Sequence, residues 1–126
     1  MATPKRILIV DDEDDIREVA QVSLELVGGY EVLTASSGCA GVERARGAQP
    51  DAILLDVMMP AMDGPATLVA LRADPRTRDI PVVFLTAKTH AAERQRLGQL
   101  GAAAILTKPF DPLKLAGDVA KALDWS

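Results

Sequence analysis

Residues 52–56 read Ala-Ile-Leu-Leu-Asp, a short apolar run that ends in a carboxylate, and the same pattern recurs along the chain. Each run is continuous rather than alternating, which is typical of strands in a parallel sheet with both faces covered. The other runs, with the polar residues that follow them, are Ile7–Val10 with Asp11 and Asp12, Val82–Leu85 with Thr86, and Ala104–Leu106 with Thr107, Lys108 and Pro109.

Helix-like segments separate these runs, and strands that alternate with helices predict an α/β fold. Five such units with right-handed crossovers predict a doubly wound five-stranded parallel sheet in the order 2-1-3-4-5, with five helices on both faces. In that order the first and third strands are neighbours, so Asp11, Asp12 and Asp56 meet in one crevice at the carboxyl edge. We expect the strands near residues 6–10, 30–35, 51–56, 81–86 and 103–107.

The helices are predicted from apolar spacing and from residues that cap their ends. Helices are expected at about 38–47, at 64–73 with Leu68 and Leu71 inward, and at 91–100 with Leu97 and Leu100 on one side. The first helix carries Ile16, Val19, Ala20, Ser23, Leu26 and Val27 at helical spacing and ends at Gly28-Gly29. The last helix is predicted to begin with Asp111 as N-cap and Pro112 as first residue, with a core stripe of Leu113, Ala116, Val119, Ala120 and Leu123.

The composition fits one globular domain over residues 1–126, with no effector domain in this chain. Fourteen basic and eighteen acidic residues give a net charge of −4, which argues against direct contact with nucleic acid. The apolar runs are too short to span a membrane, and the first residues lack the apolar core of a signal peptide. The single cysteine, Cys39, excludes an internal disulfide and favours the cytoplasm.

Residues 11–15 read Asp-Asp-Glu-Asp-Asp, more acid than a helix N-terminus needs. Capping accounts for Glu13 to Asp15, each worth roughly 0.3–1 kcal/mol. Asp11, Asp12 and Asp56 remain, and two carboxylates ~4 Å apart repel by about 4 kcal/mol at a partly buried site. A hard cation relieves this repulsion, and Mg²⁺ suits a site with few carboxylates. The alternative is plain helix capping with no metal.

Within this crevice Asp56 is the carboxylate best placed to attack phosphorus. Thr86 and Lys108 would add a hydroxyl and a fixed positive charge, which are the usual positioning and electrostatic parts of phosphoryl transfer. Taken separately, a threonine that closes a strand is usually a cap and a loop lysine is usually solvated. Their predicted convergence at one edge of the sheet indicates a site.

Four motifs make the chain resemble the receiver domains of two-component response regulators over essentially its whole length. Together, in this order and spacing, they are highly specific. The motifs are Ile-Leu-Ile-Val-Asp-Asp at 7–12, Leu-Leu-Asp-Val-Met-Met-Pro-Ala-Met-Asp-Gly at 54–64, Phe-Leu-Thr-Ala at 84–87 and Leu-Thr-Lys-Pro-Phe at 106–110.

The resemblance implies a phosphorylation-activated switch in a two-component system or phosphorelay. Asp56 would take a phosphoryl group from a sensor histidine kinase or a histidine phosphotransfer protein and form an aspartyl phosphate. Mg²⁺ would be held by Asp12, Asp56 and the backbone carbonyl of Met58, with Asp11 acting through water. Lys108, in a cis peptide with Pro109, would pair with the phosphoryl group.

The resemblance also implies that Thr86 swings toward the phosphoryl group. The face formed by the fourth helix, fifth strand and fifth helix would then change for a downstream protein. No membrane contact is expected, and the chain would be a monomer or a phosphorylation-dependent dimer.

Ile105 departs from this family, which often has an aromatic switch residue at that position. Ala103 and Ala104 likewise make the output face small and apolar. Met58 and Lys88 flank the path of an attacking water and neither activates water well, so we expect slow autodephosphorylation, with a half-life of minutes or longer.

Three other functions are weighed against this one. An aspartate-nucleophile phosphatase needs a second aspartate where this chain has Met58, so we predict no enzyme of that kind. A flavodoxin-like cofactor binder should have a phosphate loop where this chain has five acids. A degenerate receiver used only for docking would not need the set of Asp11, Asp12, Asp56, Thr86 and Lys108.

Overall fold

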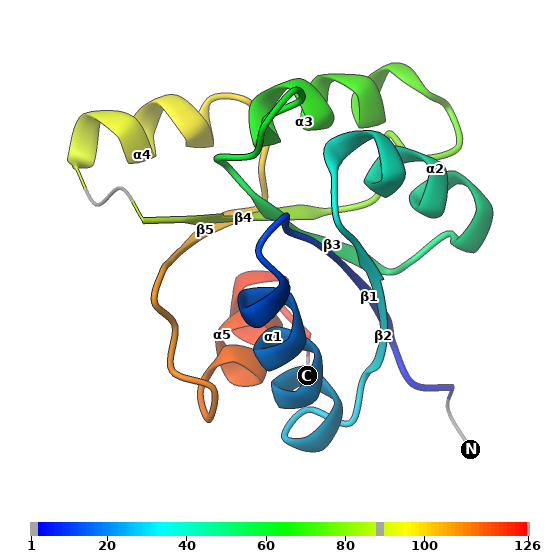
Figure 1. Cartoon of the computed structure of the whole chain (residues 1–126), viewed down its shortest axis with the longest axis vertical. Coiled ribbons are helices and arrows are strands. Elements are labelled where there is room, and N and C mark those ends of the chain that lie inside the picture. Colours follow the sequence, from blue (N-terminus) through cyan, green and yellow to red (C-terminus); the bar gives the residue numbers. More distant parts are fainter. Residues whose placement is uncertain (1–2, 88–89, 126) are drawn as a thin grey trace.

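The computed structural model describes residues 3–87 and 90–125 of the chain. Strands and helices alternate through these residues (Figure 1). Within the described residues, no helix combines the length and the apolar character that a membrane span needs. The elements are β1 (Arg6–Val10), α1 (Asp14–Leu26), β2 (Glu31–Ala35), α2 (Gly38–Ala48), β3 (Ala52–Asp56), α3 (Gly64–Ala73), β4 (Val82–Thr86), α4 (Ala91–Gly98), β5 (Ala104–Thr107) and α5 (Leu115–Ala122).

The five strands form one parallel sheet in the order β2-β1-β3-β4-β5, which confirms the predicted topology. Helices α1 and α5 cover one face of the sheet, and α2, α3 and α4 cover the other (Figure 1). Every residue of β3 and β4 is buried. Burial on both faces explains why these strands read as continuous apolar runs.

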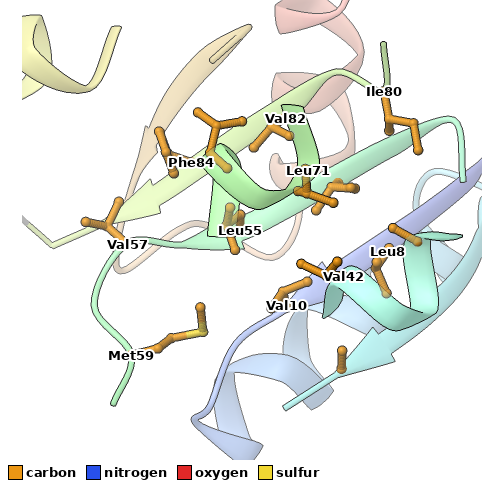
Figure 2. Close-up of a cluster of buried hydrophobic side chains, with 14 of the residues drawn as sticks. Leu8, Val10, Val42, Leu55, Val57, Met59, Leu71, Ile80, Val82 and Phe84 are labelled. Carbon is orange, nitrogen blue, oxygen red and sulfur yellow. The ribbon is translucent and has the colours of Figure 1, made fainter. Parts of the chain in front are cut away.

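Two hydrophobic clusters fill the space between the sheet and its two helical layers. Because successive strand residues point to opposite faces, Leu8 and Val10 enter the cluster under α2 and α3, whereas Ile7 and Ile9 enter the cluster under α1 and α5. Figure 2 shows the first of these clusters, in which Phe84 is fully buried. The strands are thereby clamped from both sides, and this fixes where their carboxyl ends lie.

Helix α2 contains a glycine, which is a weak helix former, at a point where the helix lies close to the sheet. Gly41 lies within it, and a Cβ at that position would come within 2.8 Å of Cγ2 of Val10 on β1. The glycine therefore lets the helix approach the sheet closely. Ser37 caps the helix by accepting the Ala40 N–H at 3.1 Å.

The predicted start of the last helix is wrong by about one turn. A carboxylate oxygen of Asp111 accepts the backbone N–H of Leu113 at 2.9 Å. The backbone carbonyl of Asp111 accepts the N–H groups of Lys114 and Leu115. Residues 112–114 form a turn, and α5 begins at Leu115. Leu113 is consequently 77% exposed rather than part of the core stripe. The buried residues of α5 are Leu115, Ala116 and Val119.

Helix α1 forms where predicted, but its buried face is narrower than its apolar spacing suggests. Ala20, Ser23 and Leu24 face the core. Val19, Val22, Leu26 and Val27 are exposed. Helix α4 also ends earlier than predicted, at Gly98, which leaves Leu100 exposed while Leu97 is buried.

Candidate functional site

Two carboxylates lie side by side at the carboxyl edge of the sheet. Asp56 is the last residue of β3, and Asp11 directly follows β1, its neighbour in the sheet. Val10 pairs with Leu55, so the two aspartates leave their strands at the same level. Asp11 is fully buried and Asp56 is 3% exposed, so both charges lie out of water.

Asp12 completes an acidic group at this edge. One carboxylate oxygen from each of Asp11, Asp12 and Asp56 lies within 4.8 Å of the other two. Asp12 is exposed and lies at the mouth, whereas Oδ2 of Asp56 is buried and has no hydrogen-bond partner among the described residues. A hard oxygen donor set with one uncommitted buried oxygen fits a divalent cation such as Mg²⁺.

Lys108 brings a positive charge into this acidic group from the far end of the chain. Its Nζ lies 2.8 Å from Oδ2 of Asp11 and 3.1 Å from Oδ1 of Asp56. The Lys108 backbone N–H donates to the Thr86 carbonyl at 2.8 Å, which fastens the residue to the end of β4. The Lys108–Pro109 peptide is cis, as the resemblance implied.

The electrostatics of Asp56 and Lys108 follow from their burial. Burial raises the pKa of Asp56 to about 6, although the hydrogen bond from Lys108 opposes this change and the charge of Asp11 adds to it. Burial lowers the pKa of Lys108, but its hydrogen bonds with Asp11 and Asp56 outweigh that effect, so its pKa is raised. The lysine therefore stays protonated, and Asp56 ionises reluctantly without a further cation.

The loop from Val57 to Asp63 borders the site and turns sharply back into α3. Asp63 caps α3 by accepting the Ala66 N–H at 2.9 Å. A Cβ at Gly64 would come within 2.6 Å of the carbonyl oxygen of Asp56, so only glycine allows this close return. Met58, whose carbonyl is the predicted metal ligand, has an exposed side chain in this loop.

The two predicted switch residues lie on neighbouring strands. Thr86 is buried at the end of β4, one position beyond Leu85, which pairs with Asp56. Ile105 pairs with Phe84 in the sheet and packs, half-buried, against the cluster of Figure 2. Lys88, predicted to flank the path of water, lies outside the described residues.

Glu13 is a contact of the site that the sequence did not indicate. Its position predicted a helix-capping acid, and it is the N-cap residue of α1, yet its side chain makes no capping hydrogen bond within the described part of the chain. Instead its Oε1 lies 3.4 Å from Lys108 Nζ. Only its place directly after Asp11 and Asp12 could have suggested this contact.

Residues 7–120 match the family model of the response regulator receiver domain. The chain is 39% identical to response regulator Rre1 of Synechocystis sp. over 98% of this chain and 53% of that protein. It is 43% identical to the DNA-binding dual master transcriptional regulator RpaA of the same organism, over 84% of this chain and 44% of that protein. The chain thus spans about half the length of these curated relatives.

A solved structure leads to the same family. Chemotaxis response regulator CheY4 of Vibrio cholerae is 33% identical and superposes with a TM-score of 0.88, covering 95% of this chain and 99% of that chain. The sheet order, the helical layers and the family match over residues 7–120 therefore agree. The chain belongs to the receiver domain family of response regulators.

Proposed function

We propose that this receiver domain accepts a phosphoryl group on Asp56 from a phosphohistidine of a sensor kinase or histidine phosphotransfer protein. A phosphorylation switch is the general role of the family. The position of the Asp56 side chain carries this assignment. Asp56 ends β3 next to Asp11, and its carboxylate lies 3.1 Å from Lys108 Nζ. Its Oδ2 has no hydrogen-bond partner among the described residues.

The proposed transfer balances without any further reagent. A carboxylate oxygen of Asp56 attacks phosphorus, and the bond between phosphorus and the donor's histidine nitrogen breaks. The donor ring already carries a proton on its other nitrogen, so it leaves with that electron pair as neutral imidazole. Lys108 offers its positive charge to the phosphoryl oxygens, and the Thr86 hydroxyl offers a hydrogen bond. Fixed groups of this kind lower the barrier because they are already oriented when charge moves.

Mg²⁺ is the cofactor that this donor set supports best. Asp11, Asp12, Asp56 and the Met58 carbonyl would hold it, with Asp11 acting through water. When bound, it would offset the repulsion between the Asp56 carboxylate and the incoming phosphoryl group. In this proposal the chain is a phosphoacceptor with slow autodephosphorylation rather than an enzyme acting on other substrates.

The output of the switch would be read on the face formed by α4, β5 and α5. Thr86 would move toward the phosphoryl group, and Ile105 would follow it. Because Ile105 packs against the core cluster and pairs with Phe84, the shift would pass through aliphatic packing instead of a rotating ring. A downstream protein that prefers the shifted face would stabilise it.

An apolar groove of about 380 Å³ along α1 would receive the phosphohistidine donor. Helix α1 begins at Asp14, two residues after Asp12, so the groove lies along the helix that starts at the acidic edge of the sheet. Acidic Glu18 lines the groove, and Glu25 is exposed on the same helix, which favours a donor with basic residues. The apolar lining residues are Val19, Val22, Leu26, Val27 and Leu113.

The remaining proposals concern the setting of the domain. Residues 1–126 would act as one receiver domain in the cytoplasm, as a monomer or a phosphorylation-dependent dimer, with no nucleic acid contact of its own. RpaA is named as DNA-binding. We assign no such contact to this chain because its net charge is −4.

The deciding experiment is intact mass measurement after incubation with Mg²⁺ and acetyl phosphate, run beside Asp56→Asn and Asp51→Asn. Asp51 is an exposed aspartate at the opposite edge of the sheet, where its carboxylate accepts the Arg6 N–H. We expect the wild type and Asp51→Asn to gain one phosphoryl group and Asp56→Asn to gain none. Equal gain in all three proteins would refute Asp56 as the acceptor.

A further inference from the structure

The Lys108 ammonium contacts three carboxylates at once. Its Nζ lies 2.8 Å from Asp11, 3.1 Å from Asp56 and 3.4 Å from Glu13. A protonated lysine has three N–H donors and no acceptor. The three carboxylates are therefore enough to occupy all three donors. A phosphoryl oxygen that arrives at Asp56 must displace one of them.

Glu13 is the carboxylate most easily displaced. Asp11 is fully buried, and its other oxygen accepts the Glu13 backbone N–H at 2.9 Å, so its side chain is held from both sides. Asp56 itself would carry the phosphoryl group. The Glu13 side chain has the longest of the three contacts and is 61% exposed, so water replaces Lys108 at little cost when the contact opens.

We propose that Glu13 is a positioning residue that occupies one Lys108 donor in the unphosphorylated protein and yields it to the phosphoryl group. This inference rests on the proposed function and adds a residue to it. The exchange makes and breaks no covalent bond, since one ionic contact replaces another. The N-cap residue of α1 thereby becomes sensitive to whether Asp56 is phosphorylated.

The test compares Glu13→Gln with Asp15→Asn. Asp15 lies in the first turn of the same helix, is exposed, and loses the same charge when substituted. The probe is beryllofluoride, which imitates a phosphoryl group, titrated in saturating Mg²⁺ and followed by backbone amide NMR shifts. Glu13→Gln replaces a charged acceptor of Lys108 with a weaker, neutral one that yields its place more easily. We therefore expect this variant to bind the probe about two- to five-fold more tightly than Asp15→Asn does.

The sign of this effect distinguishes exchange from structural damage. A variant that merely disturbed the site would bind beryllofluoride more weakly, and its thermal midpoint would fall. Mg²⁺ affinity measured without beryllofluoride should change by the same small factor in both variants, because it senses the lost negative charge and not the weakened contact with Lys108. Equal probe affinity in the two variants, or weaker binding by Glu13→Gln, overturns the proposal.

Failure of the proposed function has a different signature. If the wild type binds no beryllofluoride in Mg²⁺, then Asp56 is no phosphoryl site and the role of Glu13 falls with it. If the wild type binds the probe and the two variants respond alike, only the exchange by Glu13 is refuted.

Discussion

Asp56 is a single residue held in a place that disfavours its charge. Burial lifts its pKa to about 6, and Asp11 adds repulsion. Lys108 compensates one negative charge, but it is shared with two other carboxylates. The ionised carboxylate of Asp56, which would react, therefore also destabilises the metal-free protein. Protonation or a bound cation removes this destabilisation.

Substituting this residue should stabilise the metal-free protein. Folded Asp56 keeps its proton up to about pH 6, whereas the unfolded chain releases it near 3.8, so stability falls as pH rises between these values. At about pH 7.5 we expect Asp56→Asn to raise the free energy of unfolding by about 1 kcal/mol, discounted for solvent at the open mouth. The gain should vanish near pH 4.

Urea denaturation in EDTA across this pH range measures the effect. Asp51→Asn serves as the control, because Asp51 is exposed at the opposite edge of the sheet and should show no such gain. A variant at Asp56 that is less stable than the wild type at neutral pH would contradict the account.

Ala61 is a second residue under strain, in the loop that follows β3. Its φ is 65°, in the left-handed region that costs a non-glycine residue about 1–2 kcal/mol. Glycine avoids this cost in the folded state, but it also gives the unfolded chain more conformational entropy, which offsets part of the gain. Ala61→Gly should therefore stabilise the protein by up to about 1 kcal/mol. Thermal unfolding should show the opposite sign for Ala66→Gly, which lies in the first turn of α3. A destabilising Ala61→Gly would rule this reading out.

Among the elements, α1 has one face that packs on the sheet and another that is exposed. Its inner face packs on the sheet through Ala20 and Leu24, and its outer face leaves Leu26 80% exposed. The sequence could not separate these faces, because small and large apolar residues are spread around much of the helix. The predicted start of α5 was wrong for a similar reason. The turn at Asp111 delays the helix, so Leu115 is buried in place of Leu113.

If the exposed face of α1 is the docking surface, its substitution should slow phosphotransfer from a protein donor and leave phosphorylation by a small molecule unchanged. Leu26→Ser should slow phosphotransfer from a phosphohistidine donor protein about ten-fold, because burying a leucine against a partner is worth roughly 1.5–3 kcal/mol. Phosphorylation by acetyl phosphate, which needs no docking, should stay unchanged. Val69→Ser is the matched control, since Val69 is 66% exposed on α3 across the sheet. Equal slowing with both donors would argue against a docking role.

At the scale of the whole molecule, the parallel sheet is what assembles the site. The topology was predictable because the strands are apolar throughout, and a 2-1-3-4-5 order brings Asp11 and Asp56 together whatever the helices do. The contact between Glu13 and Lys108 was not predictable, because it depends on side-chain directions at the end of β1 and the start of α1.

A ligand that binds only the folded sheet edge should stabilise the entire domain. If the proposed Mg²⁺ site is correct, Mg²⁺ at about 100 times its dissociation constant would add about 2.7 kcal/mol to the free energy of unfolding. For a domain of this size we expect the thermal midpoint to rise by about 10 °C. Asp12→Asn should lose most of this rise and Asp15→Asn should keep it. The same rise in NaCl of matched ionic strength would show that the effect is not specific to Mg²⁺.

The two ends of the described chain share one layer of the fold. Ser23 on α1 donates to the Pro112 carbonyl, and the Tyr30 and Trp125 rings lie 5.6 Å apart with Lys5 over the indole. During synthesis, then, this layer of the fold is only half built by α1 and stays incomplete until residues 110–125 have left the ribosome. A chain released before α5 is complete exposes the apolar residues that α5 would otherwise bury in the cluster under α1 and α5 to water and to chaperones.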